Sequence, residues 1–361
     1  MDTKENFAKG TIKRKAILLI QLRQLGDILL CTPAIREIKK EFPDYSISFL
    51  CHQMGASILH ANPYLDEIIT YREKSSWADL LKLFSMLRKK NYFYVIDFMN
   101  NPRSAILSFL CKSQHKISIE SSRAWAYHQT IPRPPSSMYG VQSKFQLLQK
   151  AGFRPKNQGI DFPWNKEHLS PLQQLVNTEA FSSKGLRVVL SPTHRRVERK
   201  WPLSNFISLA EKLVQEWDAA VTWVWGPGEE EEIDKLISQC SEKTFKAPKS
   251  TLAELAAIMA NHDLFIGNSN GPSHVAVSTK ICTLQLHGHT NALSWCPMNT
   301  EHQAIQSPDY QKEQRVTLEK ITVTQVWQKL GEMKNSIDAK ASHRQHHQPF
   351  FRDWQQAHHE R

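Results

Sequence analysis

Short apolar runs alternate with segments of helical periodicity along most of the chain. Residues 15–20 (KAILLI) are apolar throughout after Lys15, which is typical of a strand buried on both faces of a parallel sheet. From Gly26 to Phe42 the apolar residues follow a helical period, with a kink predicted at Thr32-Pro33 and the helix end at Pro43. Further strands are expected at residues 46–51, 65–70, 92–98 and 115–119, helices at 77–90, 104–111 and 141–151, and a proline-rich loop at 131–138. This order predicts a doubly wound parallel sheet.

The same alternation restarts after a polar, weakly patterned stretch at residues 153–183. Strands are expected at residues 186–191, 219–225, 264–267 and 281–286, and helices at 204–216, 229–240, 251–261 and 272–278. We therefore expect an α/β protein with an N-terminal Rossmann-like domain (1–160), a linker (161–183), a C-terminal Rossmann-like domain (184–333) and a flexible polar tail (334–361). Two such domains form a cleft between them, which is the usual place for a ligand.

Composition narrows the class of partner but does not choose one. The 361 residues are enough for two domains, and the 40% hydrophobic and 22% charged fractions exclude collagen-like, coiled-coil and wholly disordered proteins. The net charge of +11 favours anionic partners, which include phosphorylated small molecules, anionic membrane surfaces and nucleic acid. The six cysteines form no C-x-x-C pair, so we expect free thiols. The polar N-terminus precedes too short an apolar run for a signal segment, and we expect a cytoplasmic protein.

The turn after the first predicted strand, LRQLGD at residues 22–27, is the first candidate for chemistry. Gly26 permits a tight turn there, and the start of the following helix directs free amide donors into the cleft. Asp27 could accept a proton from a substrate hydroxyl. Capping of the helix is the alternative interpretation of this carboxylate.

A basic segment, SPTHRRVERKWP at residues 191–202, follows the first strand of the second domain. Its single acid is Glu198, and its basic side chains are His194, Arg195, Arg196, Arg199 and Lys200. At the carboxyl edge of a strand, this density of positive charge suits a diphosphate. A solvated basic loop is the alternative.

Three further turns in the second domain carry candidate ligand contacts. In GPGEEEE (226–232) one glutamate could bind a ribose diol, although acids at a helix start need no function. In GNSNGPSH (267–274), Gly271 allows close approach of the backbone and the helix start could hold a phosphate, whereas His274 alone is more simply a buried structural histidine. Residues 286–297 either extend this anion pocket or form an ordinary loop.

Several motifs that would indicate other enzyme classes are missing from the sequence. It has no G-x-G-x-x-G and no G-x-x-x-x-G-K-[ST], which removes the main support for a dehydrogenase or a P-loop enzyme. It also has no D-x-D, the usual metal-diphosphate anchor of sugar-nucleotide enzymes, and no H-E-x-x-H or G-x-S-x-G. A phosphate ligand would therefore be held by cations and helix starts.

Taken in order, six segments resemble the bacterial heptosyltransferases of lipopolysaccharide core synthesis, glycosyltransferase family nine. The resemblance extends from about Ala16 to about Pro297. Each motif alone is weak, and their order and spacing carry the resemblance. The segments are LRQLGDILLCTPAIREIKKEFP, NPYLDEII, YFYVIDFMNNPRSAIL, RKWPLSNFISLAEKL, WGPGEEEE and FIGNSNGPSHVAVS.

The resemblance implies a GT-B fold and an inverting, metal-independent transfer of a heptose or related sugar from an ADP-sugar, with no cofactor. The acceptor would be the lipopolysaccharide inner core on lipid A, with peripheral contact to the inner membrane and no nucleic acid partner. Asp27 matches the general base of the family, and Arg23 and Arg103 would bind the acceptor. The implied donor-binding residues are Thr193, His194, Arg195, Arg199, Lys200, Glu230, Ser269, Asn270, Gly271 and His274.

Two positions depart from the family pattern. The aspartate of the D-[TS]-G-x-x-H motif is Ser269 here, and a hydroxyl makes a weaker hydrogen bond to a sugar than a carboxylate does. The lysine of K-x-W-P is Arg199, which can still hold a diphosphate. The Ser269 change leaves open a different donor sugar, or a catalytically impaired GT-B protein that binds nucleotide sugar or core lipid. A further hypothesis places the aromatic residues of the tail, Phe350, Phe351 and Trp354, at an anionic membrane.

Overall fold

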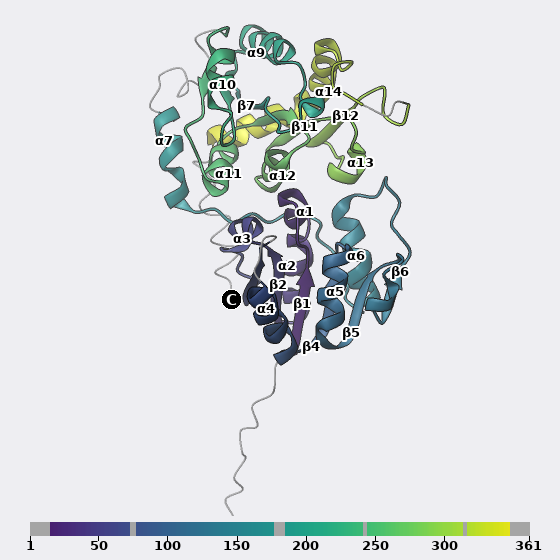
Figure 1. Ribbon diagram of the computed structural model, residues 1–361. Coiled ribbons are helices and arrows are strands. Elements are labelled where there is room, and N and C mark those ends of the chain that lie inside the picture. The colour runs from purple at the N-terminus through teal and green to yellow at the C-terminus, as the bar shows by residue number, and fades with distance from the viewer. Residues whose placement is uncertain (1–14, 73–76, 177–184, 241–243, 313–315, 347–361) are drawn as a thin grey trace, which may run out of the picture.

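Two six-stranded parallel sheets, one in each half of the chain, organise the molecule (Figure 1). The computed structural model describes residues 15–72, 77–176, 185–240, 244–312 and 316–346. The strand orders are β3-β2-β1-β4-β5-β6 and β12-β11-β10-β7-β8-β9. In each sheet the winding direction reverses between the first and fourth strands in sequence, so the topological switch points are β1/β4 and β7/β10. The predicted pair of doubly wound Rossmann-like domains is confirmed.

The N-terminal domain follows the predicted order with two additional elements, α3 and β6. Its strands are β1 (Ala16–Ile20), β2 (Ser46–His52), β3 (Glu67–Tyr71), β4 (Asn91–Asp97), β5 (Lys112–Ile119) and β6 (Gln129–Ile131). Its helices are α1 (Leu25–Leu29), α2 (Thr32–Glu41), α3 (Gln53–Leu59), α4 (Trp77–Lys89), α5 (Pro102–Leu110) and α6 (Gly140–Lys150), with a short 3-10 turn, η1 (Ala124–Ala126). The predicted kink is a complete break between α1 and α2, because Pro33 lies in the first turn of a new helix.

The C-terminal domain repeats this arrangement, with β9, β12, α13 and α14 as elements that the sequence analysis did not predict. Its strands are β7 (Arg187–Ser191), β8 (Ala220–Trp223), β9 (Thr244–Lys246), β10 (Leu264–Asn268), β11 (Cys282–His287) and β12 (His302–Gln306). Its helices are α9 (Leu203–Trp217), α10 (Glu230–Ile237), α11 (Leu252–Ala260), α12 (Gly271–Ser278), α13 (Ala292–Trp295) and α14 (Val323–His346), with the 3-10 turn η3 (Val197–Arg199).

The predicted linker contains structure of its own. Residues 166–169 form a 3-10 turn, η2 (Lys166–Leu169), and helix α7 (Ser170–Val176) follows it directly. Leu172 and Leu175 of α7 are buried against Ala220 and Ile258 of the C-terminal domain. The second half of this segment therefore packs as part of the C-terminal domain, and residues 177–183 lie outside the described ranges.

The prediction of a flexible tail from residue 334 is wrong for its first part, because α14 continues to His346. Met333 and Ile337 are buried in the C-terminal core, and Arg344 pairs with the fully buried Asp263, with Nε 2.8 Å from Oδ1. The polar composition of the segment concealed apolar residues spaced four apart, which form one buried stripe. Residues 347–361, with the three aromatic residues of the membrane hypothesis, lie outside the described residues.

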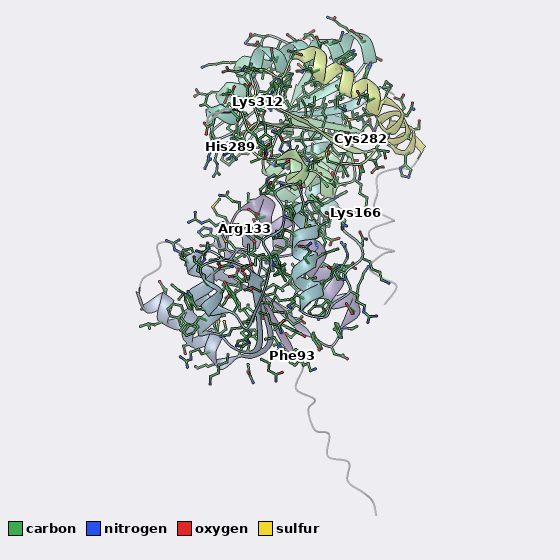
Figure 2. All side chains as sticks on the ribbon, turned by 90° about the vertical axis from the view of Figure 1, so that its right-hand side faces the viewer. Phe93, Arg133, Lys166, Cys282, His289 and Lys312 are labelled. Atoms are coloured by element: carbon green, nitrogen blue, oxygen red, sulfur yellow. The ribbon has the colours of Figure 1, made fainter. Side chains whose placement is uncertain are left out.

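Helices of the N-terminal domain cover its sheet on both faces. Side chains of α4 and α5 pack with β1 and β4 on one face, and α2, α3 and α6 contribute to the core on the other. Figure 2 places Phe93, near the amino end of β4, at the pole far from the C-terminal domain. The carboxyl ends of these parallel strands therefore point toward the other domain, as binding between two such domains requires.

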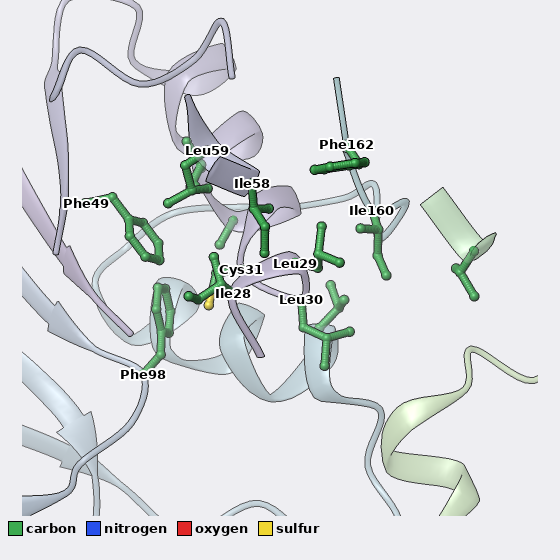
Figure 3. Packing of buried hydrophobic residues seen from close by; sticks show 14 of the residues in the cluster. Ile28, Leu29, Leu30, Cys31, Phe49, Ile58, Leu59, Phe98, Ile160 and Phe162 are labelled. Carbon is green, nitrogen blue, oxygen red and sulfur yellow. The ribbon is translucent and has the colours of Figure 1, made fainter. Parts of the chain in front are cut away.

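The two domains share a buried apolar interface. One cluster of buried residues includes Ile28 and Leu29 of α1 together with Val275 and Ala276 of α12. Figure 3 shows the N-terminal part of this cluster, where α1 packs beside Ile58 of α3 and Ile160. In Figure 1, α1 and α3 face α11 and α12 across the junction. None of the helices in the described part of the chain has the length and apolar character needed to cross a membrane.

Candidate functional site

Asp27 lies at the third position of α1, directly after the carboxyl end of β1. The side chain is half-buried, and Oδ2 accepts a hydrogen bond from the amide of Gln24 at 3.4 Å. The capping role is therefore present, and the long distance leaves the carboxylate available to a second donor. Burial raises the pKa of Asp27, whereas the positive charge of Lys144 and the Gln24 amide lower it.

The ring of His274 lies against Gly26, so that α1 of one domain meets α12 of the other. A methyl group added at Gly26 would lie 2.6 Å from Cδ2 and 2.9 Å from Nε2 of His274. The ring also packs against Trp295, with centroids 5.5 Å apart. A methyl group at Gly271 would lie 4.0 Å from Leu25, so the starts of the two helices are in contact. Only glycine at position 26 allows this approach.

Burial determines the protonation state of His274. Its side chain is buried, and Nδ1 has no hydrogen-bond partner among the described residues. Burial, with a smaller contribution from Lys144, lowers the pKa of His274 to about 4. The ring is therefore neutral at pH 7, and the structural interpretation of this histidine is supported: it forms part of the domain interface.

Lys144 is a site residue that the sequence analysis missed. It lies on α6 and is only 6% exposed, and its charge acts on both Asp27 and His274. In the sequence it falls between Val141 and Phe145, on the apolar face of the predicted helix. A lysine at such a position is rarely buried without a role, and this was the available signal.

In the C-terminal domain, two asparagines bind together the loops at the switch point. Asn268 donates from Nδ2 to the carbonyl of Pro192 at 2.8 Å and accepts from the Trp201 amide at 3.0 Å. Asn270 donates to the carbonyl of Thr193 at 3.2 Å, while its Oδ1 caps α12. The basic segment is therefore held beside the start of α12, as predicted for an anion site.

The predicted cations separate into two groups. Lys200 is paired with Glu232 of α10, with Nζ 2.7 Å from both carboxylate oxygens, so most of its charge is neutralised. Arg199 forms no ion pair within the described ranges, and burial together with Arg196 lowers its pKa. Burial and the nearby Arg199 also lower the pKa of His194. These like charges repel one another and together create a positive potential, and a bound anion would relieve the repulsion.

The remaining residues predicted to bind the donor occupy different positions around the basic segment. Thr193 is buried, whereas Arg195 is exposed at the surface of the loop. Ser269 is half-buried at the end of β10, and its amide donates to the carbonyl of Leu286 at 3.0 Å. Asn270 follows Ser269, and α12 begins at Gly271. A hydroxyl group therefore stands where the family pattern has a carboxylate.

Glu230 lies at the rim of a pocket of about 350 Å³ and pairs with Lys246 at 2.9 Å. The pocket lies at the carboxyl ends of β8 and β9, and its lining also includes Leu175, Trp225, Phe245 and Pro248. Trp225 is fixed by a hydrogen bond from its indole to the carbonyl of Ala247 at 2.8 Å. Gln174, Lys246 and Lys249 also line the pocket, so it combines apolar walls with polar groups, a combination that suits a base and a ribose.

The predicted acceptor residues lie on the N-terminal domain. Arg23 is exposed in the loop after β1, and the guanidinium of Arg103, at the start of α5, lies 6.0 Å from the ring of Tyr71. Beside them, Nε of Arg123 donates to the carbonyl of Asn100 at 2.9 Å, which joins the loops after β4 and β5. Arg123 was not predicted, because its position in an irregular loop gives no sequence signal.

Comparison with known proteins gives consistent matches over most of the chain. Residues 80–323 match the model of glycosyltransferase family 9 (heptosyltransferase). Lipopolysaccharide heptosyltransferase 3 of Escherichia coli (strain K12) is 25% identical over 304 residues, which cover 81% of this chain and 88% of that protein. A family 9 glycosyltransferase structure from Veillonella parvula has a TM-score of 0.78 at 20% identity and covers 89% of this chain and 98% of its own. The E. coli heptosyltransferase WaaC, solved with ADP, has a TM-score of 0.69 at 18% identity, with coverages of 88% and 99%.

Proposed function

The chain belongs to glycosyltransferase family 9, as its motifs predicted, and on that premise we propose that it transfers a heptose from an ADP-sugar to a lipopolysaccharide core acceptor. The names of the relative and of the ADP-bound structure support the sugar, the acceptor and the nucleotide. The observation that carries the proposal is the contact between the start of α1, which bears Asp27, and the start of α12, beside the basic segment.

On the donor side, we propose that the adenosine lies in the pocket lined by Trp225 and Pro248, with its ribose near Glu230. The diphosphate would then lie between Arg199 and the start of α12. Arginine can form two parallel hydrogen bonds to phosphate, and helix starts favour negative charge. Lys200 would act through Glu232 and α10 rather than on the phosphate itself, since both carboxylate oxygens already hold its ammonium group.

On the acceptor side, we propose Asp27 as the general base. Its carboxylate would take the proton of the attacking hydroxyl as that oxygen bonds to the anomeric carbon. The bond between that carbon and the phosphate oxygen breaks, and ADP leaves with the electron pair. Attack from the side opposite the leaving group inverts the anomeric centre. The negative charge that develops on ADP would be stabilised by Arg199 and by the amides of α12, which is why we propose that no metal is needed.

The test uses the purified full chain, ADP-heptose and a truncated lipopolysaccharide acceptor, with ADP release as the readout. We expect Asp27→Asn to lower turnover by roughly 10²–10⁴-fold, because the amide cannot accept the proton. Asparagine keeps an oxygen for the Gln24 amide, so affinity for ADP and the unfolding temperature should change little. Wild-type turnover in Asp27→Asn would overturn the assignment of the base.

Two further measurements complete this test. Arg199→Ala should weaken ADP binding while the fold is retained, and wild-type affinity would place the diphosphate elsewhere. EDTA should leave turnover unchanged, and a loss that is restored by Mg²⁺ would refute the metal-independent mechanism. Binding of ADP-heptose without transfer to any core acceptor would favour the non-catalytic alternative, which the serine at position 269 motivates.

A further inference from the structure

The outer face of α5 and the adjoining η1 turn expose three large apolar side chains. Ile106, Phe109 and Trp125 are 47%, 55% and 58% exposed. The rings of Phe109 and Trp125 contact each other edge to face, with centroids 5.4 Å apart. We call these three residues the aromatic ridge. Contiguous exposed apolar groups of this kind usually mark an interaction surface.

Helix α5 carries large apolar side chains on its outer face as well as on its inner face. Its buried positions are Leu107 and the small residues Ser104, Ala105 and Ser108, whereas Ile106 and Phe109 point outward. A helix that only covers a sheet places its large apolar side chains on the inner face. The packing of this domain therefore does not account for the ridge.

Positive charge surrounds the ridge. Residues 99–128 contain four basic side chains and a single acid, Glu120. Arg103 lies on the same exposed face of α5, and Lys112 is exposed directly after the helix. The ammonium group of Lys116 donates to the carbonyl of Phe109 at 2.8 Å and lies 5.6 Å from the centre of its ring. An anionic partner is therefore electrostatically favoured.

The chemistry of the ridge fits a lipid surface better than a protein. Tryptophan and phenylalanine beside arginine and lysine are typical of segments that lie in the headgroup region of an anionic bilayer. A stable protein interface buries about 800 Å² on each partner, and an aromatic side chain supplies only about 150–250 Å². Three side chains are a small patch for a protein partner, but they are sufficient for shallow insertion that is assisted by charge.

We propose that the aromatic ridge docks the N-terminal domain on an anionic phospholipid bilayer. The first turn of α5, which bears Arg103, connects the ridge to the loop after β4 at the carboxyl end of the sheet, where Arg123 and Asn100 join the neighbouring loops. Docking there would hold the acceptor side of the cleft at the membrane surface. Only this last consequence rests on the proposed function, because lipid binding itself requires no transfer.

The test is co-sedimentation of the full chain with vesicles, without donor or acceptor. We expect the wild type to bind vesicles that contain phosphatidylglycerol more tightly than vesicles of phosphatidylcholine alone, and less tightly as salt rises. Phe109→Ser combined with Trp125→Ser should lower the partition coefficient at least about tenfold. Leu293→Ser, which changes a side chain 45% exposed on the C-terminal domain, is the matched control and should bind as the wild type does.

Three results would overturn the proposal. The ridge double variant could partition like the wild type, or removal of residues 347–361 could by itself abolish vesicle binding. Alternatively, the double variant could convert a dimer into a monomer in sedimentation while vesicle binding persists, which would identify the ridge as a contact between copies of the chain.

Turnover measurements separate this inference from the proposed function. The double variant should retain wild-type turnover on a water-soluble core oligosaccharide and lose it on the same acceptor anchored in vesicles. A wild type that binds vesicles through the ridge but transfers no sugar would refute the proposed function and leave the docking inference intact.

Discussion

Gly26→Ala is expected to lower the free energy of unfolding, although replacing glycine with alanine in a helix usually raises it. The residue lies in the first turn of α1, and its Cα faces the ring of His274. A methyl group there would approach Cδ2 of the ring to 2.6 Å, closer than real side chains pack. The ring has little room to retreat, because His274 is 3% exposed and its ring also packs against Trp295.

The magnitude follows from two opposing terms. In an unobstructed helix, replacing glycine with alanine stabilises a protein by roughly 0.5–1 kcal/mol. Overpacking a filled interior costs typically about 1–3 kcal/mol. We therefore expect Gly26→Ala to lower the free energy of unfolding by about 1 kcal/mol. Because the clash lies between domains, part of it will be relieved by separation of α1 from α12, which should also reduce transfer activity.

Chemical denaturation of Gly26→Ala, Gly331→Ala, His274→Ala and the double variant at positions 26 and 274 tests this reasoning. Gly331→Ala in α14 is the matched control, because a methyl group there meets nothing within 4 Å, and it should stabilise. In a His274→Ala background the penalty at position 26 should disappear, which gives a coupling energy of roughly 0.5–3 kcal/mol in a double-mutant cycle. The reasoning is refuted if Gly26→Ala stabilises as Gly331→Ala does, or if its penalty persists without the histidine.

Two further predictions concern buried charges. Lys144→Met removes the charge that lowers the pKa of Asp27. Because the proposed base must be ionised to act, the acid limb of the pH profile of kcat/KM should move to higher pH. Lys144→Arg should restore the limb, and an unshifted limb in Lys144→Met would contradict the coupling. Arg344→Met should destabilise the protein by at most roughly 3–5 kcal/mol in denaturant, because the fully buried Asp263 loses its ion pair and keeps the Arg187 amide and the nearby charge of Arg187. Lys334→Met at an exposed pair should cost at most about 0.5 kcal/mol, and equal effects would contradict the burial argument.

The accuracy of the sequence-based prediction of the fold depended on the length and burial of each element. β1 and β10 were predicted because strands buried on both faces are continuous apolar runs. β6 and β9 have three residues each, too few to show a period, and their place in the sheets depends on pairing with neighbours distant in sequence. Helix α14 was missed because its polar residues outnumber the few apolar residues that contact the core.

The site could be predicted only where one local segment defined the chemistry. The turns that carry Asp27 and Asn270 follow apolar strands, so their place at the carboxyl edge of a sheet could be inferred. The residues that act on these turns from elsewhere in the chain could not be inferred. Lys144 of α6 acts on Asp27, and Trp295 of α13 packs on His274, and both reach the junction only through tertiary packing. Nothing in the sequence indicated that Lys200 would pair with Glu232 while the adjacent Arg199 would form no ion pair in the described ranges.

The contact between Gly26 and His274 relates these observations to one another. Burial lowers the pKa of His274 to about 4, so the ring is neutral at pH 7, and its position in the turn before α12 is better explained by the surface that it offers to α1. The same contact holds Asp27, one residue further, beside the start of α12 and the basic segment that Asn270 holds to that helix. If the donor is held by α12 and the acceptor by α1, their relative position is fixed to the precision of this packing. A displacement of about 1 Å at such a contact can cost about 10²-fold in rate, so a residue that touches neither substrate can still control turnover.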